Sequence, residues 1–228
     1  MFKVHSIFSS IDGEVNSFHQ GRVTTFVRFF GCNLEKECEY CDTKYANKEY
    51  SEFTSKELYN EVAKKGIKKV TITGGEPLLQ PKEDMYDFLK YLKNRHYDIS
   101  IETNGTRPVY NYMNWVDSFI IDYKLFDTTK TYKWNNINHD NPLYSRPQDI
   151  IKFIIGSKKD YLKAVEAISQ LKSHGCKCQF ALSPMHGIFD PAVLIDWCVK
   201  DKLNVIINIQ IHKYIELKED TKSPDDIF

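Results

Sequence analysis

The chain has 228 residues, 42% of them apolar and 27% charged, a composition that excludes a disordered chain and allows one globular domain with a sizeable core. Its 31 basic and 31 acidic residues give no net charge, so we expect no nucleic-acid partner held by a strong positive field. No apolar run approaches the roughly 18 residues that span a bilayer, and residues 1–5 lack the apolar stretch of a secretory signal. We therefore expect a cytoplasmic protein with no membrane partner.

Short runs rich in β-branched and aromatic residues predict strands, and amphipathic segments between them predict helices. Two helices carry end signals: Thr54 with Glu57 makes a capping box, and Gly175 suits the residue after a helix C-terminus. In chain order we expect a strand at 23–29, a helix at 55–65, a strand at 70–73, a helix at 82–95, strands at 99–103, 119–123 and 150–155, a helix at 160–174, a strand at 178–182, a helix at 191–201 and a strand at 205–211.

Helices that separate strands imply right-handed βαβ crossovers and a mainly parallel sheet. With at most seven strands, the predicted fold class is α/β, an incomplete or minimal (β/α) barrel, in a single domain over residues 1–228. Residues 126–148 are polar and show neither the apolar period of a helix nor that of a strand. This long loop is either a lid near a substrate or a surface excursion with no role. The polar tail at 216–226 is expected to be mobile.

The loops that leave the carboxyl ends of parallel strands converge on one rim, where ligands bind. Nearly all the unusual chemistry of this sequence follows a predicted strand. The residues expected on the rim are Gly31 and Cys32, Cys38, Cys41, Gly74 to Pro77, Asn104 to Thr106, Lys124, Ser183 with Pro184, and Gln210 with His212.

Three of the six cysteines, Cys32, Cys38 and Cys41, fall within ten residues. In a reducing cytosol such a cluster indicates a metal site more than a disulfide framework. A structural zinc site would need a fourth ligand, whereas an iron–sulfur cluster held by three thiolates leaves one iron open for catalysis. The spacing favours the cluster and leaves zinc and unliganded thiols open as alternatives.

The other cysteines are interpreted as packing residues. Cys176 and Cys178 flank one lysine, so an extended strand would send both thiols to the same face. Cys198 lies in an apolar helical stretch, where a free cysteine behaves as a small apolar side chain.

The run Gly74-Gly75-Glu76-Pro77 leaves an apolar strand for a loop where glycines allow another molecule to approach the backbone. Glu76 could then accept a hydrogen bond from a cationic amine. A tight turn before a helix would explain the glycines and the proline equally well, but not a carboxylate on the same rim as three thiols.

Clustered cysteines followed by Gly-Gly-Glu-Pro at the next strand end resemble the radical S-adenosylmethionine (SAM) superfamily. That superfamily normally has three residues in the first cysteine gap and two in the second, whereas here five separate Cys32 from Cys38. Within it, several segments look like the 7-carboxy-7-deazaguanine synthase family, and together they cover most of the chain. They are Ser10-Ile11-Asp12-Gly13-Glu14, residues 26–34, Cys41-Asp42-Thr43, residues 101–105 and residues 209–213. The sequence departs from the family at Val15, where the family usually has glycine.

The resemblance implies that Cys32, Cys38 and Cys41 hold a 4Fe-4S cluster, with SAM on the open iron. The cofactor's sulfonium is then cleaved by one electron from a donor such as flavodoxin or ferredoxin. The resulting radical takes hydrogen from C6 of 6-carboxy-5,6,7,8-tetrahydropterin. Ring contraction with loss of ammonia gives 7-carboxy-7-deazaguanine for queuosine and related deazapurines. The implied enzyme is a carbon–nitrogen lyase and a homodimer.

The resemblance also assigns site residues. Those implied for SAM are Tyr40, Gly75, Glu76, Glu102 and Asn104, with Lys124 and Ser183 as weaker candidates. Those implied for the pterin are Ile11, Asp12, Gly13, Glu14, Arg28, Thr73, His212 and the terminal Phe228. A satisfied histidine at a strand end is the alternative for His212. Arg28 offers a planar charged fork for the pterin carboxylate, although a surface arginine at a strand end is the alternative. Thr43 is the implied Mg2+ ligand, and would otherwise be a helix cap or a turn hydroxyl.

Two other functions stay open at this stage. An activase that generates a glycyl radical on a partner protein would share the cluster and Gly-Gly-Glu-Pro, but would not need the segment 10–14 with Arg28, and should show an exposed groove. A zinc-stabilised binding module would use the same cysteines without chemistry on a substrate.

Overall fold

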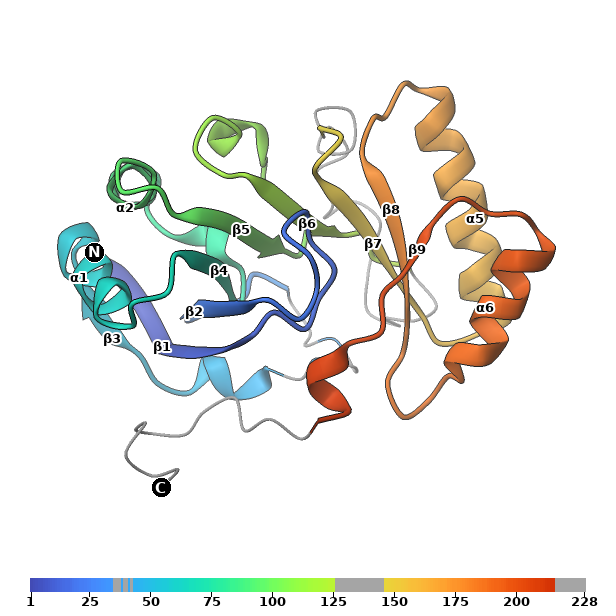
Figure 1. The fold of residues 1–228 in the computed structure, drawn as a ribbon, viewed down its shortest axis with the longest axis horizontal. Helices are drawn as coiled ribbons and strands as arrows, with labels where there is room; N and C mark the ends of the chain where they lie inside the picture. Colours follow the sequence, from blue (N-terminus) through green and yellow to red (C-terminus); the bar gives the residue numbers. More distant parts are fainter. Residues whose placement is uncertain (35–37, 39–40, 42, 126–145, 216–228) are drawn as a thin grey trace.

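The computed structural model describes residues 1–34, 38, 41, 43–125 and 146–215. Within these residues nine strands form one sheet, in the order β3-β1-β2-β4-β5-β6-β7-β8-β9. The sheet runs as an open arc and does not close on itself (Figure 1). The predicted α/β fold, an incomplete barrel with mainly parallel strands, is confirmed.

All seven predicted strands are present, and each neighbouring pair among them is parallel. They are β2 (Val23–Phe29), β4 (Lys69–Gly74), β5 (Asp98–Thr103), β6 (Ser118–Asp122), β7 (Ile150–Ile155), β8 (Gln179–Pro184) and β9 (Ile206–Ile207). Only β9 is much shorter than predicted. It pairs with β8 alone, and the chain beyond it turns into the short helix η5 (Ile211–Lys213).

Two strands were not predicted, β1 (Phe2–Ile11) and β3 (Ser51–Phe53). They extend the sheet beyond β2 with antiparallel pairing: β1 pairs with β2 from Val4 to Ile11, and β3 pairs with β1. Polar residues occupy about half of β1, and β3 is very short, so neither carries a strong apolar pattern. The strand conformation of β1 therefore depends on pairing with β2, and that of β3 on pairing with β1.

The four predicted helices are confirmed to within two residues at each end. They are α1 (Ser55–Lys64), α2 (Lys82–Lys93), α5 (Lys158–Ser173) and α6 (Pro191–Lys200), with short 3-10 turns η1 (Lys44–Asn47), η2 (Pro77–Leu79) and η3 (Tyr110–Tyr112) between other elements. The capping box of α1 forms as predicted, because Thr54 Oγ1 accepts from the Glu57 amide and Glu57 Oε2 accepts from the Thr54 amide at 2.8 Å. Figure 1 shows α1 and α2 beside one half of the sheet and α5 and α6 beside the other.

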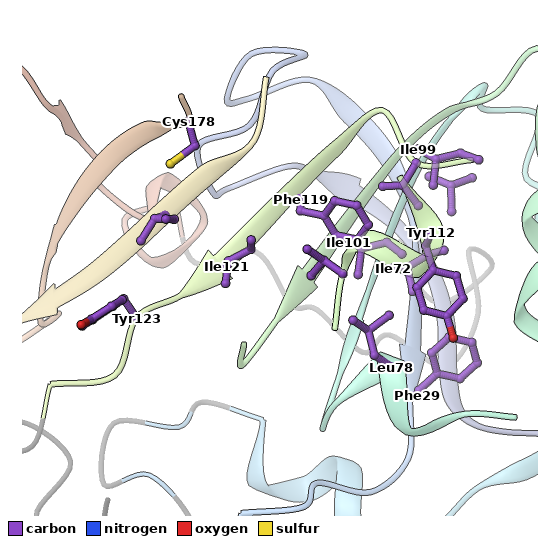
Figure 2. Close-up of a cluster of buried hydrophobic side chains, with 14 of the residues drawn as sticks. Phe29, Ile72, Leu78, Ile99, Ile101, Tyr112, Phe119, Ile121, Tyr123 and Cys178 are labelled. Atoms are coloured by element: carbon purple, nitrogen blue, oxygen red, sulfur yellow. The ribbon is translucent and has the colours of Figure 1, made fainter. Parts of the chain in front are cut away.

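The two faces of the parallel strands differ in polarity because side chains alternate along each strand. One face packs under the helices and supplies the apolar core, which includes Phe153. Figure 2 labels Ile72, Ile101, Phe119 and Ile121 of the same core. The other face carries the polar side chains Arg28, Thr73, Glu102, Asp122, Lys152 and Ser183, besides a few apolar ones such as Ile150 and Ala181. The helices thus cover the apolar face, and the inner face of the arc is left for polar and charged groups.

Most of the predicted long loop, residues 126–145, and the tail 216–228 lie outside the described residues, so the lid and tail interpretations stay predictions. In the part of the chain that is described, no helix has the length and apolar character needed to cross a membrane.

Candidate active site

A cavity of about 710 Å³ lies at the carboxyl ends of the parallel strands, and we call it the rim cavity. Its volume is typical of a site for a small ligand. Of the residues predicted from sequence for the site, those that line it are Ile11, Gly13, Glu14, Arg28, Cys32, Cys38, Cys41, Thr43, Thr73, Gly75, Glu102, Asn104, Lys124 and His212. Asp12, Glu76 and Ser183 lie behind its wall, and Tyr40 and Phe228 lie outside the described residues.

The three thiols Cys32, Cys38 and Cys41 line the rim cavity, and none is in a disulfide. Burial raises the pKa of Cys32 and of Cys38, and the neighbouring thiols add to the effect at Cys38. In the described part of the chain, no three His, Cys, Asp or Glu side chains meet closely enough to hold one metal ion. A 4Fe-4S cluster spans several irons and does not need ligands that meet at one point, so this set of donors fits a cluster better than a zinc ion.

Gly75 fixes the start of the cysteine loop. A Cβ atom on Gly75 would lie 1.9 Å from the carbonyl oxygen of Gly31, so only glycine fits there. The next amide, that of Glu76, donates to the same Gly31 oxygen at 2.8 Å. The loop after β4 therefore packs directly on the backbone that carries Cys32.

Glu76 does not face the cavity, contrary to the interpretation that it accepts from a ligand amine. Its side chain is fully buried and accepts from the amides of Leu78 at 2.9 Å and Asn104 at 2.7 Å, and from Thr103 Oγ1. Burial raises the pKa of Glu76 to about 7, although these hydrogen bonds act in the opposite direction. Glu76 thus joins the loops after β4 and β5, and any effect on a ligand passes through Asn104, whose Nδ2 lies 3.7 Å from Cys32 Sγ.

A chain of alternating charges crosses the wall of the rim cavity. Lys152 Nζ lies 3.1 Å from both Glu14 Oε2 and Asp122 Oδ1, and Asp122 Oδ2 lies 2.5 Å from Lys124 Nζ. Burial opposes ionisation of Asp122, but Lys124 and Lys152 outweigh it and lower the pKa of Asp122 to about 2. In the same way the charge of Lys152 holds the pKa of Glu14 below its ordinary value despite burial. Glu14, Asp122 and Lys152 are therefore charged near neutral pH.

Two residues near the end of the described chain fix Glu14. Asn208 Nδ2 donates to Glu14 Oε2 at 2.5 Å, and Gln210 Nε2 donates to Glu14 Oε1. Asn208 Oδ1 also accepts from the Val15 amide at 3.0 Å. Val15, at the position where a glycine was expected, packs with other apolar side chains on the inner face of the sheet.

Asp12 and Ser183, implied ligands from sequence, have their polar groups engaged inside the protein. Asp12 is buried and paired with Lys69 at 2.9 Å, and it accepts from Thr71 Oγ1 at 2.8 Å. Ser183 Oγ donates to the carbonyl oxygen of Asn208 at 3.0 Å. Both side chains support the wall of the cavity, and neither lines it.

Arg28 lies on the inner face of β2, is 4% exposed, and lines the rim cavity. Its guanidinium carbon is 5.5 Å from the centroid of the Phe8 ring and 5.6 Å from that of Tyr45. Two aromatic rings at these distances favour a cation at this position. The alternative of a surface arginine at a strand end is excluded by this burial.

His212 and Thr43 also line the rim cavity. A Cβ atom on Gly13 would lie 1.8 Å from Nδ1 of His212, so the imidazole packs directly on the turn that carries Glu14. Thr43 Oγ1 lies 3.5 Å from Cys41 Sγ, beside η1. The hydroxyl of Thr43, the predicted Mg2+ ligand, therefore lies next to the thiol of Cys41, a predicted cluster ligand.

The sequence interpretation missed Lys152, Asp122 and Asn208, although each lies in or next to a predicted strand. A charged residue inside an apolar run, as in Ile150-Ile151-Lys152-Phe153, was the available signal. Because the run is apolar on both sides of it, such a lysine must point away from the core, either to solvent or into a polar cavity. Sequence alone does not distinguish these two positions.

The first prediction concerns the ionisation of Glu102. Burial raises the pKa of Glu102 from 4.5 to about 8, and the charges of Glu14 and Asp12 act in the same direction. Between these values the folded protein keeps a proton that the unfolded chain has released, so the free energy of unfolding falls as pH rises. Glu102→Gln keeps the shape without the ionisation. We expect it to match the native stability near pH 5 and to exceed it by about 2 kcal/mol near pH 8.

Urea unfolding at both pH values measures this difference. Glu52→Gln is the matched control, because Glu52 is exposed and its neutralisation should change the free energy of unfolding equally little at either pH. A constant difference between Glu102→Gln and the native chain from pH 5 to 8 would show that Glu102 is ionised throughout.

Comparison with known proteins agrees with this geometry. Residues 26–193 match the family model of the Radical SAM superfamily. A 7-carboxy-7-deazaguanine synthase from Clostridium acetobutylicum is 38% identical over 221 residues, 94% of this chain and 96% of the relative. A synthase of the same name from Chlorobaculum tepidum is 34% identical over 215 residues, 93% of each chain.

The fold is shared with a solved structure. The crystal structure of QueE from Escherichia coli superposes with a TM-score of 0.68 at 21% identity, over 91% of this chain and 93% of that one. The family match, the two relatives and the fold agree with one another. The chain therefore belongs to the radical SAM superfamily and, within it, to the 7-carboxy-7-deazaguanine synthase family.

Proposed function

We propose that this chain is a 7-carboxy-7-deazaguanine synthase, a lyase that contracts the ring of 6-carboxy-5,6,7,8-tetrahydropterin with loss of ammonia. The observation that carries the proposal is one cavity lined by three thiols, the buried Arg28 and the anchored Glu14. Relatives that bear this name match more than nine-tenths of the chain. The product would enter the synthesis of queuosine or a related deazapurine.

The 4Fe-4S cluster would be held by Cys32, Cys38 and Cys41. SAM would contact the lining residues Gly75, Glu102, Asn104 and Lys124. When bound there, the cluster and SAM would supply the carbon radical that takes a hydrogen atom from the substrate. No described group of three ligands competes for a single metal ion in the cavity. The zinc-stabilised module is therefore the weaker alternative.

The chain's own polar groups suit a pterin that carries a carboxylate. Arg28, which lies near two aromatic rings, presents donors in a rigid fork that matches a carboxylate. Glu14 is charged and fixed by Asn208, and Lys152 pairs with it, so an acceptor is oriented before any substrate arrives. Such preorganised groups bind the donor edge of a pterin without reorganising, which favours binding. Thr73 and His212 complete this part of the lining.

The activase alternative shares the cysteines but has no use for a buried arginine next to an anchored carboxylate. Anaerobic incubation of the reconstituted protein with SAM, a reductant, Mg2+ and the carboxytetrahydropterin, followed by mass detection of the deazapurine, tests the two functions. We expect conversion of the pterin with release of ammonia. Cleavage of SAM without any conversion of the pterin would overturn the synthase proposal.

Magnesium is a further part of the proposal. Thr43 carries a hydroxyl on the cavity lining, and a hard cation prefers oxygen ligands. We expect Thr43→Val to raise the Mg2+ concentration needed for half-maximal activity by roughly tenfold, an effect of about 1.4 kcal/mol, with cluster absorbance unchanged. Thr43→Ser, which keeps the hydroxyl, is the matched control. An identical Mg2+ response in all three proteins would remove Thr43 from this role.

The remaining parts of the proposal concern partners and location. A small electron carrier such as flavodoxin or ferredoxin would reduce the cluster, and two copies of the chain would form a homodimer in the cytoplasm. Sedimentation of the purified protein tests the dimer directly.

A further inference from the structure

Cys176 and Cys178 lie between the end of α5 and the start of β8. They precede β8, whereas the last residue of β8, Pro184, lines the rim cavity. The pair is therefore at the opposite edge of the sheet from the candidate active site, and the proposed function makes no use of it.

The two sulfur atoms lie 3.1 Å apart, and the cysteines are not joined by a disulfide. Cys178 packs in the core and is 7% exposed. It belongs to the buried cluster drawn in Figure 2, while Cys176 is half-buried. The Cys176 amide donates to the carbonyl of Leu171 at 3.0 Å, and the ladder of β8 begins at Gln179. Residues 176–178 thus belong to neither element and can adjust without breaking a helix or a strand.

Cys176 also differs from the other cysteines in its ionisation. The hydrogen bond from Cys178 lowers the pKa of Cys176 to about 7, while burial acts in the opposite direction. Burial instead raises the pKa of Cys32, Cys38 and Cys198. The thiolate is the reactive form of cysteine, so Cys176 combines access, thiolate character and a second sulfur in contact.

We propose that Cys176 and Cys178 form a reversible oxidation site that reacts with low-molecular-weight disulfides and closes to an intrachain disulfide. The Cys176 thiolate attacks one sulfur of the small disulfide, breaks its S–S bond, forms a mixed disulfide and releases one thiolate. Cys178 then attacks the Cys176 sulfur, and the second small thiolate leaves. The two protein thiols lose two electrons and two protons, and the small disulfide becomes two thiols.

The structure favours oxidation at this site over binding of a structural metal. The described residues offer no third His, Cys, Asp or Glu ligand beside the pair, and a structural zinc ion requires four. A disulfide across a single intervening residue closes a very short loop, so it restricts the unfolded chain little and adds little stability to the fold. Such a disulfide is readily reduced. The bond is therefore expected to be labile, as a reversible site requires.

Peptide mapping after oxidation tests the proposal on the full-length protein with its cluster reconstituted. The protein is incubated with oxidised glutathione without oxygen, free thiols are blocked with N-ethylmaleimide, and trypsin cuts after Lys172, Lys177 and Lys200. Peptides 173–177 and 178–200 should then be joined by a bond that dithiothreitol breaks. Separate peptides, each carrying only blocked thiols, would overturn the proposal.

Three variants assign the atoms. Peptide 178–200 also contains Cys198, so the link must persist in Cys198→Ser and disappear in Cys178→Ser, which should keep glutathione on Cys176. A link that is lost in Cys198→Ser would place the disulfide elsewhere and overturn the proposal. In Cys178→Ala, which removes the hydrogen bond, alkylation of Cys176 at pH 7 should slow about fivefold, because lost thiolate outweighs gained nucleophilicity. An unchanged rate in that variant would contradict the role of Cys178.

Discussion

Replacing Arg28 with lysine should lower kcat/KM for the carboxytetrahydropterin by roughly 100-fold, a loss of about 2.7 kcal/mol in transition-state stabilisation. Lysine keeps the charge but has no planar fork, so it cannot hold a carboxylate through two parallel hydrogen bonds. It also lacks the flat guanidinium that contacts the rings of Phe8 and Tyr45. Since a carboxylate is bound in the ground state as well, most of the loss should appear as a higher KM.

Steady-state kinetics with varied pterin concentration measure this effect, and cluster absorbance checks that the variant is loaded. Arg22→Lys is the matched control, because Arg22 is exposed and pairs at the surface with Asp98 at 2.8 Å. That control should change kcat/KM less than twofold, in keeping with the small worth of an exposed ion pair. A fall in kcat for Arg28→Lys at an unchanged KM would contradict the assignment of Arg28 to substrate binding.

Lys152→Met is expected to destabilise the fold by about 3 kcal/mol and to lower activity at least 100-fold. The lysine bridges Glu14 and Asp122, so its loss leaves the buried carboxylate of Glu14 close to the half-buried one of Asp122 with one cation fewer. Asp122 keeps Lys124 as a partner, whereas Glu14 keeps only the hydrogen bonds from Asn208 and Gln210 among its described contacts. Glu14 should therefore take up a proton or move, and the acceptor offered to the pterin is lost.

A double variant separates stability from activity here. Adding Glu14→Gln to Lys152→Met removes the uncompensated charge and should restore roughly half of the lost stability without restoring activity. Lys200→Met, at an exposed position of α6, is the matched control and should leave both unchanged. Thermal unfolding and product assays measure the two effects. If Lys152→Met were as stable and active as Lys200→Met, the charge chain would have no functional role.

The strength of these two effects has a common origin in the two-faced sheet. Arg28 and Lys152 occupy strands whose alternate residues pack in the helix-covered core. Their side chains are therefore fixed on the opposite face by the strands themselves, not by flexible loops. Rigid strands place charged groups more precisely than loops do, so truncating either group costs more than truncating an exposed charge.

The sequence predicted the elements that local chemistry specifies. The helix α1 begins where its capping box lies, and α5 ends before Gly175, which has a φ of +85°. Each buried parallel strand carried an apolar run strong enough to be identified alone. β1 and β3 escaped prediction because β1 depends on pairing with β2 and β3 on pairing with β1, which local sequence does not encode.

The sequence also determined which chemistry gathers at the rim, since residues that follow parallel strands share one edge of the sheet. Cys32, Gly75 and Asn104 could be grouped in this way before any coordinates were considered. The direction in which a single side chain points could not be predicted from the sequence. Glu76 turned inward, because buried amides of the neighbouring loops needed its carboxylate as an acceptor.

Only the tertiary structure decided the partners of Glu14. Lys152, Asn208 and Gln210 lie more than a hundred residues away in the chain and reach Glu14 because the arc of the sheet brings its first and last strands toward one cavity. Periodicity and motifs report on neighbours within a few residues. A buried charge is decided by whichever distant group compensates it, and that pairing exists only once the chain is folded.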